Sequence, residues 1–64
     1  MMSVEEKVLE ALRLSPKGAG LTQLVKQTGL KRSEVLRALE ALVNKGLVEK
    51  VVKGCRATYV AKQG

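Results

Sequence analysis

Residues 20–48 read GLTQLVKQTGLKRSEVLRALEALVNKGLV, and the apolar spacing in this stretch predicts two helices joined by a tight turn. The first helix covers residues 21–28, where three apolar residues recur at helical spacing: Leu21, Leu24 and Val25. Gly29 follows, and a glycine at this position allows the left-handed conformation that ends a helix sharply. The next helix therefore begins within a few residues.

The helix after the turn covers residues 32–44 and is amphipathic. One stripe, expected to be buried, carries apolar residues spaced by four and three: Val35, Leu39 and Leu42. At about 100° per residue, the opposite side carries mainly polar residues. Its members are Ser33, Glu34, Arg37, Glu40, Ala41 and Asn44. This outward side is the candidate binding surface of the helix.

The flanking segments predict one more helix and a β-hairpin. Ser3 and Glu6 have the spacing of a capping box, so a helix is expected over residues 4–14, before Pro16. Two β-branched runs, 47–52 and 57–62, enclose a short glycine-containing turn and predict the hairpin. Adjacent valines at 51 and 52 interrupt the alternation, so either hairpin face could be the buried one. The expected architecture is a single α+β domain over residues 1–64.

The composition limits the chemistry that the chain can perform. Its 64 residues are 45% apolar, with no histidine, no aspartate and one cysteine, Cys55. A single cysteine excludes an internal disulfide, and a structural zinc would lack soft ligands. Acid–base and nucleophilic mechanisms lack partner groups as well. We therefore expect no enzyme activity, no cofactor and no metal.

The apolar runs and the charge indicate a location and a partner. No apolar run approaches the length of a membrane span, and Glu5 and Glu6 interrupt the pattern of a signal peptide, so we expect a cytoplasmic protein without a membrane partner.

The net charge is +6, and residues 16–64 hold ten Lys and Arg against three Glu. A positive field concentrated in this part predicts a polyanionic partner, although charge that merely keeps the chain soluble is the alternative.

Residues 20–48 with the predicted hairpin resemble the helix-turn-helix core of MarR-type regulators. In that core a Leu-rich second helix, Thr-Gly-Leu, a recognition helix and a Gly-Leu-Val entry to the wing follow one another. The resemblance implies a winged helix-turn-helix domain with its third helix in the DNA major groove and its wing on the adjacent backbone. It assigns DNA contacts to Lys31, Arg32, Ser33, Arg37, Lys50, Lys53 and Arg56. Arg37 is the best candidate for a base edge, because arginine can donate two hydrogen bonds to guanine.

The third helix departs from the usual pattern of such regulators. Lys31 stands where a Ser or Thr cap is common, and Glu34 and Leu36 replace small polar residues. Together with Ala38, Glu40 and Ala41, they make this helix less typical of DNA binding. The helices through which such regulators dimerise have no counterpart in the sequence. We therefore expect a monomer in free solution, and a dimer only on DNA or through a small surface that includes the first helix.

The leading hypothesis is a duplex-DNA-binding protein that serves as a small transcriptional regulator or a chromatin-associated module, nucleoid-associated in a prokaryote. One alternative is a protein-interaction winged helix within a larger transcription, replication or membrane-remodelling complex. Another is a winged helix that binds structured RNA.

Cys55 and Tyr59 have modest predicted roles. Lys53 and Arg56 flank Cys55 closely, and positive charge favours a thiolate. With no second cysteine to resolve an oxidised thiol, an incidental reduced cysteine is favoured over a redox sensor. Tyr59, the one aromatic residue, is expected to pack its ring against the helices.

Overall fold

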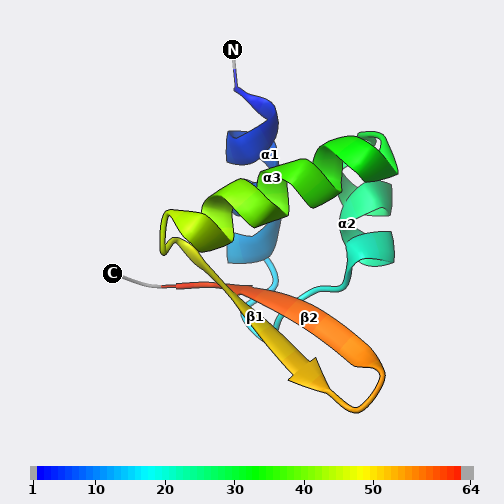
Figure 1. Ribbon diagram of the computed structural model, residues 1–64. Helices are drawn as coiled ribbons and strands as arrows, with labels where there is room; N and C mark the ends of the chain where they lie inside the picture. The colour runs from blue at the N-terminus through cyan, green and yellow to red at the C-terminus, as the bar shows by residue number, and fades with distance from the viewer. Residues whose placement is uncertain (1, 63–64) are drawn as a thin grey trace.

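The computed structural model describes residues 2–62, which form three helices followed by an antiparallel two-stranded hairpin (Figure 1). In chain order the elements are α1 (Val4–Arg13), α2 (Leu21–Thr28), α3 (Arg32–Asn44), β1 (Val48–Lys53) and β2 (Arg56–Ala61). This is the α+β winged helix-turn-helix fold that the sequence predicts. We call the β1–β2 hairpin the wing.

Local sequence signals account for both ends of α1. The Ser3 hydroxyl accepts from the Glu6 amide and the Glu6 carboxylate accepts from the Ser3 amide, each at 3.2 Å, so the capping box is confirmed. The helix ends at Arg13, one residue before the predicted end. Pro16 follows shortly after, and its ring disfavours helical geometry in the residue before it.

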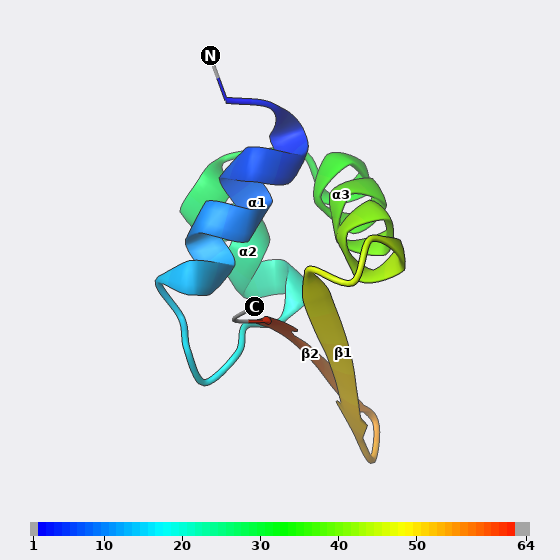
Figure 2. The same ribbon diagram turned by 90° about the vertical axis from the view of Figure 1, so that its left-hand side faces the viewer.

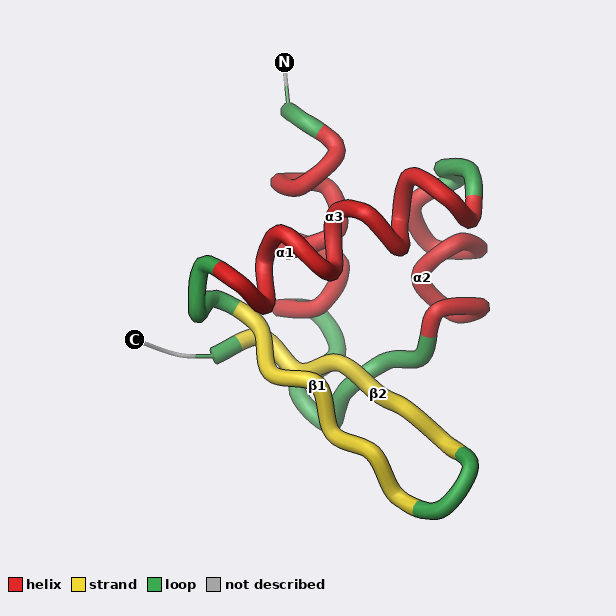
Figure 3. The backbone as a smooth tube through the Cα atoms, viewed as in Figure 1, coloured by secondary structure: helices red, strands yellow, loops and turns green. Residues whose placement is uncertain are grey.

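The turn between α2 and α3 also follows the sequence prediction. Gly29 has a φ of +71°, in the left-handed region that a residue with a Cβ rarely adopts. The Thr28 hydroxyl donates to the Leu24 carbonyl at 2.7 Å and accepts from the Leu30 amide at 3.3 Å. These bonds, together with the half-buried Leu30, stabilise the turn. The chain changes direction there between α2 and α3 (Figure 3).

The core lies where the three helices meet the base of the wing. Figure 2 shows α1 and α2 next to each other, with α3 crossing beside them above the wing. Eight side chains of this core are 2% exposed or less: Val8, Leu12, Ala19, Leu24, Val35, Leu39, Leu42 and Val48. Aliphatic side chains fill most of this small core and Tyr59 completes it, so each large side chain carries a substantial share of the stability.

The register of the wing resolves the face that the sequence leaves open. Lys50 is opposite Tyr59 and Val48 is opposite Ala61, and the face that these pairs share carries the buried Val48 and Tyr59. Tyr59 also forms a bridge with Ala19, through hydrogen bonds of 2.9 and 3.0 Å. The loop before α2 therefore fastens the base of the wing to the helices.

The two strands differ by one residue from the predicted ranges 47–52 and 57–62. Lys53 and Arg56 belong to the strands and face each other across a turn formed by Gly54 and Cys55. Gly54 has a φ of +59°, which lets the chain reverse within this short turn. At the other end, Lys62 lies beyond β2 but donates its amide to the Leu47 carbonyl at 2.9 Å.

We expect Leu39→Ala to lower the free energy of unfolding by about 2–5 kcal/mol, because it leaves a cavity in a fully buried site. Urea unfolding followed by circular dichroism measures this loss. The matched control is Leu47→Ala, since Leu47 is 43% exposed and should lose far less. Equal losses in the two variants would contradict the assignment of the core.

Candidate nucleic-acid interface

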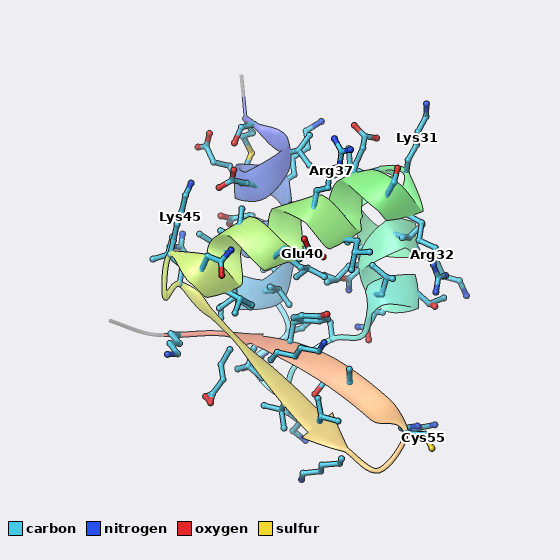
Figure 4. All side chains as sticks on the ribbon, viewed as in Figure 1. Lys31, Arg32, Arg37, Glu40, Lys45 and Cys55 are labelled. Carbon is cyan, nitrogen blue, oxygen red and sulfur yellow. The ribbon has the colours of Figure 1, made fainter. Side chains whose placement is uncertain are left out.

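The first group of candidate residues lies at the beginning of α3. Arg32, Ser33 and Arg37 are exposed on this helix, and Lys31 is the exposed residue just before it. Their side chains lie outside the buried stripe of α3, as helical geometry predicts. In Figure 4 Lys31 and Arg37 extend from the edge of α3 farther from the wing, and Arg32 lies beside α2.

Glu34 caps α3, a role that the sequence analysis did not assign to it. The backbone amide of Lys31 donates to Glu34 Oε1 at 3.1 Å. The Lys31 ammonium is only a hydrogen-bond donor, so it cannot accept a bond from the Glu34 amide. Only one half of a capping box therefore forms. The lysine thus gives up a capping bond and adds a positive charge at the end of the helix where the macrodipole is also positive.

The three candidate residues of the wing do not share one face. Lys50 lies on the face that carries Tyr59, directed toward α3. Lys53 and Arg56 face each other on the opposite side, since side chains alternate along a strand. Directly opposed like charges destabilise a hairpin, so the Lys53–Arg56 pair opposes folding of the wing tip.

Lys17 is a cation that the sequence analysis did not place in the site. It borders a shallow groove of about 320 Å³ together with Lys53 and Arg56. A Cβ added at Gly18 would lie 3.1 Å from the Val60 Cγ2 atom, so the loop passes very close to β2. No local pattern predicts this proximity, because it depends on how the loop before α2 crosses the wing.

A second groove, of about 340 Å³, separates α3 from the wing. Its walls combine α3 and hairpin residues: Leu36, Glu40, Val43, Asn44, Lys50 and Tyr59. Tyr59 is buried there, as expected for a ring that packs under the helices. Ala38, by contrast, is 3% exposed and belongs to the core, so counting it with the surface residues that make α3 less typical was wrong. It lies on the same side of the helix as Leu42.

The seven candidate residues keep their polar groups available to a ligand. Within residues 2–62 the ion pairs are Arg13–Glu10 at 3.9 Å and Lys45–Glu5 at 2.6 Å, and neither includes a candidate residue. An ion pair between Arg37 and Glu40, which their spacing allows, does not form in this part of the chain. Cys55 is exposed in the wing turn.

No helix between residues 2 and 62 is both long and apolar enough to cross a membrane. The same residues contain no group of three or more His, Cys, Asp or Glu side chains that could hold a metal ion.

The fold and this exposed basic surface define a winged helix-turn-helix domain, a class of DNA-binding domain. Comparison with protein families identifies the family within this class. The model of the IclR helix-turn-helix domain matches residues 7–51, and the chain belongs to this family. The narrower likeness to MarR-type regulators stays a prediction.

Comparison with solved structures gives the same fold. One similar structure comes from a study of the DNA recognition and protein interaction domains of HOP2, which concerns homologous DNA pairing. It superposes with a TM-score of 0.78 at 22% identity, over 94% of this chain and 100% of that one. At this identity the likeness shows a shared fold. A search of curated proteins found no match.

The missing half of the α3 capping box generates a prediction. Lys31→Ser supplies the hydroxyl that can accept from the Glu34 amide, so we expect the free energy of unfolding to rise by about 1 kcal/mol. Urea unfolding measures the gain. The control is Lys31→Ala, which removes the same charge without adding an acceptor, and equal stability of the two variants would contradict the capping argument.

Proposed function

We propose that this domain binds duplex DNA, with α3 in the major groove and the wing along the adjacent phosphate backbone. The observation that carries the proposal is the exposed set of cations on α3 and the wing, none of which forms an ion pair within residues 2–62. In this arrangement Arg37 reaches a base edge, while Lys31 and Arg32 lie near phosphates. We further propose that the domain acts as a small transcriptional regulator or a chromatin-associated module.

Charge distribution supports the proposal. Residues 16–64 hold ten Lys and Arg against three Glu, while the other three acids, Glu5, Glu6 and Glu10, belong to α1. Of these α1 acids, Glu5 borders the depression that Arg37 also lines. Arginine and lysine differ in what they offer here, since arginine donates two parallel hydrogen bonds and lysine a compact charge. Arg37 and Arg32 suit base edges or phosphates, and the lysines suit phosphates best.

A second candidate function, binding of a protein partner, is favoured by a groove between α1 and α2. Its volume is about 430 Å³, and its lining includes Met2, Ala11 and Leu14. Leu14 is 77% exposed, which is unusual for a large apolar side chain in so small a domain. This groove shares no residue with the candidate DNA surface, so a protein partner could bind there independently.

An amide chemical-shift titration with a random-sequence duplex distinguishes these candidates. Shifts concentrated on α3 and the wing support DNA binding, and absence of any shift at about 50 mM salt overturns it. A parallel titration with an RNA hairpin tests the structured-RNA alternative, which predicts the larger shifts with RNA.

Phosphate contacts make the affinity depend on salt. If four to six cations neutralise phosphates, the logarithm of the association constant should fall with the logarithm of salt concentration with a slope of about −4 to −5. Fluorescence anisotropy at several salt concentrations measures the slope. A slope near zero would contradict backbone binding and favour a protein partner.

Substitutions on α3 and on the wing should have different effects. Arg37→Ala should cost about 1–3 kcal/mol on a preferred sequence and much less on random duplex. The double variant Lys53→Ala with Arg56→Ala should weaken binding to all duplexes alike and reduce the salt slope by about two units. Binding assays on matched specific and random duplexes measure both effects.

The charge-matched control removes Lys7 and Arg13, two cations of α1, and should weaken binding much less than the wing variant. If Arg37→Ala changes neither duplex while the wing variant abolishes binding, α3 does not enter the groove.

A further inference from the structure

Leu36 and Glu40 lie one helical turn apart on the side of α3 that faces the wing. Both are exposed, and both line the groove whose opposite wall includes Lys50. Glu40 is visible on the front of α3 in Figure 4, whereas Arg37 projects from the far edge of the helix. Arg37 borders a different depression, shared with Val4 and Glu5 of α1. The exposed surface of α3 therefore has two edges with different side chains. Leu36 and Glu40 lie on the edge beside the wing, and Arg37 lies on the edge beside α1.

Leu36 does not belong to the core, and the carboxylate of Glu40 has no bonded partner within residues 2–62. Leu36 is 40% exposed and lies outside the core, while Val35 and Leu39 of the same helix are completely buried. Glu40 takes part in no ion pair and in no side-chain hydrogen bond among residues 2–62. The other acid on this helix, Glu34, is by contrast engaged in the cap.

Both residues are unfavourable on a surface that contacts only phosphates. A carboxylate repels the backbone, and an exposed leucine leaves apolar area in water. Such departures from local preference are common where a residue serves function. The floor of the major groove offers each side chain a complementary group, because thymine exposes a C5-methyl and cytosine an N4 amino donor.

We propose that Leu36 and Glu40 read bases, Leu36 by contact with a thymine methyl and Glu40 by accepting a hydrogen bond from a cytosine amino group. Residues four apart on a helix have Cβ atoms about 5–6 Å apart. Base pairs stack at about 3.4 Å, so the two bases lie one to two steps apart. This inference rests on the proposed function and names the sequence feature that the α3 surface selects.

Selection from a random duplex library, followed by sequencing of the bound fraction, tests the inference. The wild-type chain should enrich duplexes with a thymine and a cytosine at this spacing. Leu36→Ala should lose the preference for thymine and keep the preference for cytosine. Glu40→Gln should lose the preference for cytosine and keep the preference for thymine. On the selected duplex, replacing that thymine by deoxyuridine removes only the methyl group and should weaken wild-type binding about fourfold. The same replacement should leave Leu36→Ala binding unchanged.

Matched controls separate base reading from general effects. Leu47→Ala removes a leucine of similar exposure that lies outside α3, and Glu49→Gln removes an exposed carboxylate from the wing. Both controls should retain the wild-type sequence preference. Glu40→Gln and Glu49→Gln should each raise the affinity for random duplex, because each removes one negative charge near the backbone.

The outcomes distinguish failure of this inference from failure of the proposed function. No binding to any duplex at about 50 mM salt overturns the proposed function itself. If the chain binds duplexes without enriching any sequence, base reading is overturned but duplex binding is not. The same conclusion follows if both variants retain the wild-type enrichment. An unchanged affinity for the deoxyuridine duplex overturns the role of Leu36 without any change to the protein, so it does not depend on how the variants fold.

Discussion

Burial of one side of α3 is the constraint on which the rest of the structure depends. Val35, Leu39 and Leu42 all lie in the core, so α3 can rotate about its axis only by exposing them. Burying each such side chain contributes about 1.5–3 kcal/mol, a large fraction of the stability of so small a domain. The same packing that holds α3 in place therefore also fixes which side chains it presents to a ligand.

The wing depends on a second, weaker attachment. An isolated two-stranded hairpin is at best marginally stable in water, and this one gains support at its base from Val48, Tyr59 and the bridge to Ala19. The tip has no such support, and its facing cations Lys53 and Arg56 repel each other. The wing is thus firmly held where it meets the helices and electrostatically strained where it would contact phosphates.

The outward side of α3 brings together two kinds of recognition chemistry. Arg37 has the donors for guanine or phosphate, while Leu36 and Glu40, on the margin beside the wing, suit a methyl group and an amino group. Phosphates contribute affinity to any duplex, whereas groove contacts discriminate among sequences. Because this side of α3 carries few polar residues, the proposed duplex binding would draw its affinity mainly from the phosphate backbone.

The sequence by itself determined the elements of this fold, because their signals are local. Apolar residues three and four apart define the buried side of α3, the Ser3–Glu6 spacing defines the start of α1, and Gly29 defines the turn between α2 and α3. The same helical geometry placed Arg37 outside the core. Each of these features depends on residues a few positions apart, whose distances the backbone fixes directly.

Only the tertiary structure decided which residues share a surface. It set the register that pairs Lys53 with Arg56, and it decided which face of the wing is buried, a choice that the adjacent valines of β1 leave open. It brought Lys17 beside the wing, because the loop before α2 passes close to β2. These outcomes depend on contacts between distant segments, and the free energy of packing selects them for the molecule as a whole.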